Sequence, residues 1–185
     1  LMWANHNANH LWDKRNSDND LETVIWSGVV TPEIFDEICD RTIEKYFKKE
    51  NYYCMDGCPV YMIFDIDNFI RSFGTSDECK RAIDEFRKKA VDAGFKGLHL
   101  QFVHWRNRVF NWLNDNDSQK GVTSSQMYDF LGADSVTSYN WGCSTDFDGD
   151  FTDVANNYID AIKKETKTLN IPFYPNISVG WDNNV

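Results

Sequence analysis

The sequence predicts an α/β fold of the (β/α)8-barrel type, and two observations support this fold class. Five apolar runs alternate with four amphipathic segments along the 185 residues, which predicts a regular succession of strands and helices. The apolar runs are nearly continuous, without strict alternation, as is typical of parallel strands buried on both faces. The expected strands cover 1–6, 60–67, 98–105, 135–141 and 176–184.

The four segments between these runs carry helix signals. Thr31 is the expected N-cap of the first helix, and Pro32 occupies its first helical position, where a missing N–H costs nothing. In the second helix, Ser76 is the expected cap and Gly94 the expected stop. The expected helices cover 31–50, 76–94, 124–132 and 151–169.

The residues at the ends of the strands favour a barrel over an open doubly wound sheet. No expected strand is followed by a GxGxxG or GxxxxGK[ST] turn, which a nucleotide-binding open sheet usually carries. Each strand instead ends in aromatic and hydrogen-bonding side chains, and barrel active sites are built from the C-terminal ends of many strands. A complete barrel needs eight strands and about 250 residues. We therefore expect 1–185 to be a single domain of about five central β/α units, whose sheet edges are covered by the remainder of the barrel or by a second copy.

Composition limits the partners. The formal net charge of −10 and the lack of a basic stripe argue against nucleic acid. No run reaches the roughly 18 apolar residues of a membrane span. The chain opens directly on an expected strand, so an export signal is expected upstream and an extracytoplasmic location, secreted or periplasmic, is favoured.

The five cysteines are an odd number without CxxC spacing. Cys54 and Cys58 flank an apparent turn, where a disulfide or half of a metal site is the alternative interpretation. Scattered buried or turn residues are the preferred one. The cysteines therefore do not identify a redox compartment.

The aromatic and hydrogen-bonding side chains at the ends of the expected strands predict a sugar-binding site. Flat aromatic faces stack on the C–H faces of a sugar ring, while Asn, Asp and His hold its hydroxyls. For Trp3 the alternative role is packing in the core, and for Asp182 it is capping a following helix. The expected substrate-binding residues are Trp3, Asn5, His6, Asp65, His104, Trp105, Tyr139, Trp141, Trp181 and Asp182.

Catalytic residues are not identified by the sequence. Asp65 and Asp182 are the only carboxylate pair from separate strand ends, and a pair on different strands is what glycosidases use. Substrate binding is the preferred role for both. A metal site from His6, His10 and His104 with either carboxylate is the alternative, but the HxH pair common in barrel metallohydrolases is absent. No metal and no cofactor are therefore expected.

Several motifs together resemble a known family. The resemblance is to the glycoside hydrolase family 99-like domains, which include the WbsX-type glycosyltransferases. It rests on WANH at 3–6, NYYCMDGCPVYMIFD at 51–65, GFKGLHLQ at 94–101, DSVTSYNW at 134–141 and YPNISVGWDNN at 174–184. The motifs occur in the family's order and span the chain.

The resemblance implies a (β/α)8 barrel that acts on glycans, with the five strands as its third to seventh. In family 99 the catalytic carboxylates lie in an Asn-Glu-Trp-x-Glu-Gly segment on the eighth strand, after a Gly-aromatic-x-Asp strand that Gly180, Trp181 and Asp182 resemble. The sequence to Val185 has no such segment, so little hydrolase activity is expected of the isolated chain. The favoured function is hydrolysis of mannose-type glycans. A glycosyltransferase of polysaccharide biosynthesis and a non-catalytic carbohydrate-binding barrel are the alternatives.

Overall fold

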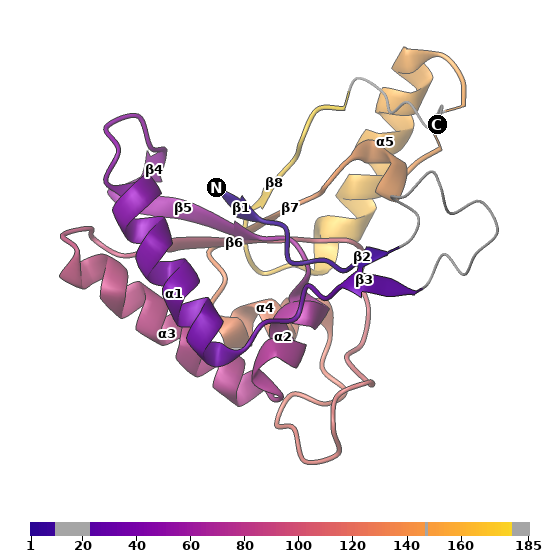
Figure 1. Cartoon of the computed structure of the whole chain (residues 1–185). Helices are drawn as coiled ribbons and strands as arrows, with labels where there is room; N and C mark the ends of the chain where they lie inside the picture. The colour runs from indigo at the N-terminus through magenta and orange to yellow at the C-terminus, as the bar shows by residue number, and fades with distance from the viewer. Residues whose placement is uncertain (10–22, 147, 179–185) are drawn as a thin grey trace.

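The fold is a mostly parallel β-sheet with helices packed against it, seen in a computed structural model that describes residues 1–9, 23–146 and 148–178 (Figure 1). Five parallel strands lie side by side in chain order: β1 (Met2–Trp3), β5 (Cys58–Ile63), β6 (His99–Val103), β7 (Ser135–Thr137) and β8 (Phe173–Tyr174). This confirms the α/β class and the parallel sheet. The strands of the described residues form an open path from β1 to β8 and no closed barrel.

The helices follow the expected alternation, with one addition. They are α1 (Pro32–Thr42), continued by a π-helical turn at Ile43–Phe47, then α2 (Ile66–Phe73), α3 (Ser76–Asp92), α4 (Ser124–Leu131) and α5 (Phe151–Glu165). Helix α2 was not expected, because its first residues belong to the apolar run that predicts a strand at 60–67. That strand ends at Ile63. Of the last expected strand, 176–184, residues 176–178 are not in a strand and the rest lie outside the described residues, while β8 lies just before it.

The helix caps show where local signals suffice. Thr31 caps α1 as expected, with its Oγ1 accepting a hydrogen bond from the Ile34 N–H at 3.3 Å. Helix α3 is capped by Thr75 instead of Ser76. Ser76 is the first helical residue, and both its N–H and its hydroxyl donate to the carboxylate of Asp117. The expectation was wrong because Asp117, far along the chain, binds the serine.

Two antiparallel strand pairs were also not expected. Strands β2 (Ala8–Asn9) and β3 (Val24–Trp26) pair with each other outside the main sheet. Strand β4 (Cys54–Met55) pairs with β5 through a two-residue turn, Asp56-Gly57, whose φ angles are 51° and 85°. Positive φ at both positions is typical of a type I′ turn. Cys54 and Cys58, at the base of this turn, are free cysteines, so the alternative disulfide does not form.

The two faces of the sheet differ in character. One face carries large apolar side chains such as Tyr61, Leu100 and Phe102, which form the core together with residues of the helices. Figure 1 shows α1 to α4 gathered on one side of the sheet. The other face carries a polar row in which the Nε2 of Gln101 donates to the Ser135 hydroxyl at 2.9 Å. The sheet is therefore covered by helices mainly on one face.

Candidate functional site

An aromatic cluster lies at the carboxyl ends of four neighbouring parallel strands. It consists of His6, Phe64, Trp105 and Tyr139, which come after β1, β5, β6 and β7. Phe64 is at its centre: its ring centroid lies 4.9 Å from that of Trp105, 5.0 Å from that of Tyr139 and 5.2 Å from that of His6. Side chains separated by more than a hundred residues in the chain are thereby brought to one surface.

The rings of the aromatic cluster are fixed, yet partly open to solvent. Phe64 meets the planes of both Trp105 and Tyr139 nearly edge-on, at 85° and 89°. The indole N–H of Trp105 donates to the backbone carbonyl of Phe64 at 3.1 Å, which orients the ring. Trp105 is 37% exposed and Tyr139 is 38% exposed. Large aromatic rings held this way offer a ready-made surface for stacking.

A cavity of about 420 Å³ adjoins the aromatic cluster. Its lining residues come from the start of α2 and from the segment after β6, and they are Asp65, Ile66, Asp67, Trp105, Arg106 and Arg108. Arg108 and Asp67 form a two-pronged ion pair across this cavity, with N–O distances of 2.7 and 2.5 Å. The cavity thus combines one aromatic wall with charged and hydrogen-bonding groups, within the size range of small-ligand sites.

Asn5 and Asp65 have positions that serve the fold directly. The side-chain amide of Asn5 donates to the Asp65 carbonyl at 2.6 Å, and its oxygen accepts from the Asp65 N–H at 2.8 Å. Asp65 is the N-cap of α2, because its Oδ1 accepts from the N–H groups of Asp67 and Asn68. Within the described part of the chain, Asp65 Oδ2 accepts no hydrogen bond. Asn5 therefore joins β1 to the end of β5, while Asp65 keeps one carboxylate oxygen available at the cavity.

Two of the expected tryptophans lie apart from the aromatic cluster. Trp3 packs with Phe35 and Phe69 in the core, at centroid distances of 5.5 and 6.1 Å. Trp141 stacks on Tyr158 at 4.9 Å, and its indole N–H donates to the Asn176 carbonyl. Both positions fit a packing role. Trp181, Asp182 and His10 lie outside the described residues.

His104 is buried beneath the site. Its Nδ1 lies 3.1 Å from the Tyr128 hydroxyl, and its Nε2 lies 3.4 Å from Glu165 Oε1 on α5, without hydrogen-bond geometry. Burial lowers the pKa of His104 below its usual value and outweighs the nearby Glu165 carboxylate, which favours the charged ring. Arg108 lowers the pKa further. His104 is therefore a buried neutral side chain that connects β6 with α4 and α5.

The His104 pKa predicts a pH effect on stability. Because the folded-state pKa lies below the unfolded value of about 6.5, the unfolded chain binds a proton more readily as the pH falls below 6.5. We expect the free energy of unfolding to fall as the pH drops below about 6.5, by at most about 1.4 kcal/mol per pH unit from this group. In His104→Asn, whose amide can still reach Tyr128, that part of the slope should vanish in urea titrations at several pH values. Parallel pH profiles for both proteins would contradict it.

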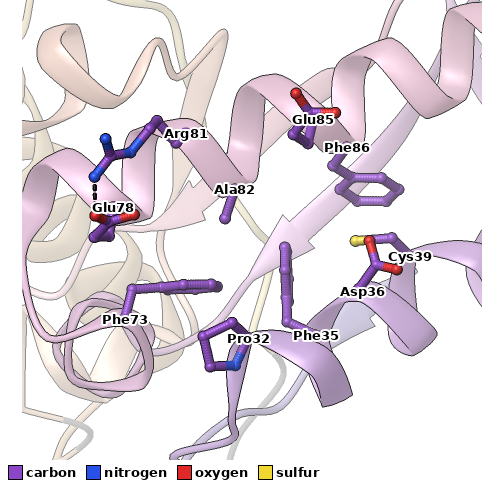
Figure 2. Close-up of a pocket in the computed structure, with 10 residues that line it drawn as sticks. All are labelled: Pro32, Phe35, Asp36, Cys39, Phe73, Glu78, Arg81, Ala82, Glu85 and Phe86. Atoms are coloured by element: carbon purple, nitrogen blue, oxygen red, sulfur yellow. Dashed lines mark hydrogen bonds and ion pairs between the residues drawn. The ribbon is translucent and has the colours of Figure 1, made fainter.

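A second cavity, of about 320 Å³, lies on the helical side of the molecule. Figure 2 shows the rings of Phe35, Phe73 and Phe86 lining it, with the ion pair of Glu78 and Arg81 at one end. All its lining residues belong to α1, α2 and α3. It is a groove between packed helices and shares no residue with the cavity at the strand ends.

Phe64 is one of the residues of this site that the sequence did not point to. It lies between the last strand residue, Ile63, and Asp65, and a phenylalanine there was assigned to the apolar run. Arg106 and Arg108 were also missed, because neither stands at the end of an apolar run.

In residues 1–9, 23–146 and 148–178 no group of three or more His, Cys, Asp or Glu side chains could hold a metal ion. No helix among these residues is long and apolar enough to cross a membrane.

Comparison with known protein families identifies a family for this chain. The family model described as Glycosyltransferase WbsX matches residues 1–185, the full length of the chain. No curated protein and no solved structure matches at a significant level.

Proposed function

Because the chain belongs to the WbsX glycosyltransferase family, which is carbohydrate-active, we propose that its strand ends form the sugar-binding site of a glycan-active barrel. The aromatic cluster carries this proposal. Trp105 and Tyr139 come from neighbouring strands, their centroids are 5.7 Å apart, and each keeps more than a third of its surface open. Partly exposed rings beside a polar cavity suit a sugar, which needs stacking and hydrogen bonding together.

We further propose that residues 1–185 are a single domain and contribute the third to seventh strands of a (β/α)8 barrel. The strand order supports this, because β1, β5, β6, β7 and β8 follow the chain without the reversal that a doubly wound sheet contains. The one-sided cover by α1 to α4 supports it as well, since barrel helices form an outer ring around the strands. The polar face would then line the barrel interior.

The reaction we propose is glycoside hydrolysis, with mannose-type glycans as substrate, because of the resemblance to family 99. Asp65 is given a binding role through its Oδ2, since its Oδ1 caps α2. Asp182 is proposed to bind sugar hydroxyls. Sugar transfer is the second candidate, favoured by the description of the matching family. Product analysis separates them: a protein extended at both ends should release free sugar from aryl mannosides as a hydrolase, but require an activated sugar donor as a transferase.

The binding proposal is tested by a glycan array followed by titration of the best ligand. Tyr139→Ala should weaken binding about 2- to 12-fold, because one stacking contact contributes about 0.5–1.5 kcal/mol. Tyr53→Ala is the matched control, since Tyr53 is an exposed tyrosine at the opposite end of β5. It should bind as the unmodified protein does. If no glycan binds, or if both variants lose affinity equally, the proposed function fails.

A further inference from the structure

Arg106 is a feature of the strand-end cavity that sugar hydroxyls alone do not explain. Its side chain lines the cavity beside Trp105 and is exposed. Among the residues that the structure describes, it pairs with no carboxylate. Of the other charges in the cavity, Asp67 pairs with Arg108, and Asp65 caps α2 through its Oδ1 while its Oδ2 stays open to the cavity.

Arg108 differs from Arg106 in being held by two partners, the Asp67 carboxylate and the Phe110 ring. Both of its terminal nitrogens donate to Asp67, and its guanidinium lies 4.6 Å from the ring centroid of Phe110. Its charge is compensated and its position fixed, so it forms part of the cavity wall. Arg106 has no such compensation within the described part of the chain, and its positive charge lies next to the exposed indole.

The chain as a whole carries a formal net charge of −10. The overall field repels anions, so any preference for an anion must come from a local contact. The guanidinium group suits this purpose, since its planar fork matches the two oxygens of a carboxylate or phosphate and it sheds water more easily than an ammonium group does.

We propose that this cavity binds an acidic sugar, with the ring against Trp105 and an oxyanion of the sugar paired with Arg106. The inference rests on the proposed function and specifies its ligand class. Asp65 Oδ2 lies on the same cavity and would accept a hydrogen bond from a hydroxyl of the same ring. The anionic edge of the sugar would then face the Arg106 guanidinium, and its hydroxyl edge would face the Asp65 carboxylate. The oxyanion is the carboxylate of a uronic acid or the phosphate of a sugar phosphate.

The experiment compares three ligands by isothermal titration: methyl mannuronide, mannose 1-phosphate and the neutral methyl mannoside. The unmodified chain should prefer at least one acidic ligand over the neutral one by about fivefold or more, the range of a partly exposed charge-assisted contact. Arg106→Gln should abolish that preference, and Arg106→Lys should keep only part of it. Arg41→Gln is the charge-matched control, because Arg41 is exposed on α1 and does not line the cavity. It should leave the preference unchanged.

The outcomes are separable. A preference for the mannuronide alone identifies a uronic acid site, a preference for the phosphate alone identifies a sugar phosphate site, and either supports the inference. Equal binding of all three ligands, or a preference that persists in Arg106→Gln, overturns it while the proposed sugar site stands. Failure of every sugar to bind overturns both proposals.

Discussion

Replacing Trp105 with alanine is expected to lower glycan affinity by about tenfold or more, which corresponds to about 1.4 kcal/mol. Among the described residues, Trp105 alone belongs both to the aromatic cluster and to the lining of the adjoining cavity. The substitution removes a stacking surface, one wall of the cavity and the ring that packs on Phe64 and Tyr139. Because these losses act at the same place, the effect should exceed that of Tyr139→Ala.

Trp112→Ala is the matched control for this substitution. Trp112 is 40% exposed, close to the 37% of Trp105, and lies in the same connection between β6 and α4. It stacks with the Arg71 guanidinium at 4.7 Å and does not line the strand-end cavity. Titration calorimetry should give unchanged affinity for Trp112→Ala and an intermediate value for Trp105→Phe. Equal losses of glycan affinity in the two alanine variants would contradict a specific role of Trp105 at the strand ends.

Replacing Asn5 with alanine is expected to lower the free energy of unfolding by about 2–4 kcal/mol. Asn5 is 1% exposed, and its side chain makes two hydrogen bonds to the backbone of Asp65. Its own carbonyl accepts from Asn68 Nδ2 at 3.0 Å. Alanine would leave the N–H and C=O of Asp65 without these partners, in a place that water reaches poorly. The connection between β1 and the start of α2 would loosen.

Urea denaturation checks this expectation. Asn51→Ala is the control, since Asn51 is exposed in a turn and such substitutions usually change stability by less than about 0.5 kcal/mol. Asn5→Asp should also be destabilising, because a carboxylate cannot donate to the Asp65 carbonyl. A loss below about 1 kcal/mol in Asn5→Ala would show that the backbone of Asp65 finds other partners.

The sequence was most informative where one local pattern decides the structure. Thr31 followed by Pro32 identifies the start of α1, and Gly132 in the left-handed conformation ends α4. Asp65 shows the limit. An aspartate after an apolar run fits either a strand-end ligand or a helix N-cap, and the choice depends on whether the next residues are helical. Ile66 and Phe69 lie on the buried face of α2 and pack in the core. Two apolar residues at helical spacing are too few to distinguish a helix from a strand in the sequence.

The candidate site was predicted in part for a similar reason. His6, Trp105 and Tyr139 do gather at neighbouring strand ends, as the parallel arrangement requires. His104 and Trp105 are adjacent in the chain but face opposite sides, since side chains alternate where the backbone is extended. The sequence predicts that the two side chains point in opposite directions, but not which of them points to the aromatic cluster. Which of two neighbours faces the mouth depends on the register with β5 and β7, which only the assembled sheet defines.

The indole N–H resonance of Trp105 is the most direct test of the central claim that the strand ends bind sugar. It donates to the Phe64 carbonyl inside the aromatic cluster, so a ring stacked there must change its environment. The resonance can be assigned by its loss in Trp105→Phe and followed by nitrogen-15 NMR during a glycan titration. We predict a saturable shift whose dissociation constant equals the calorimetric one. A glycan that binds while this resonance stays still, with shifts at Trp26 or Trp112 instead, would contradict the account.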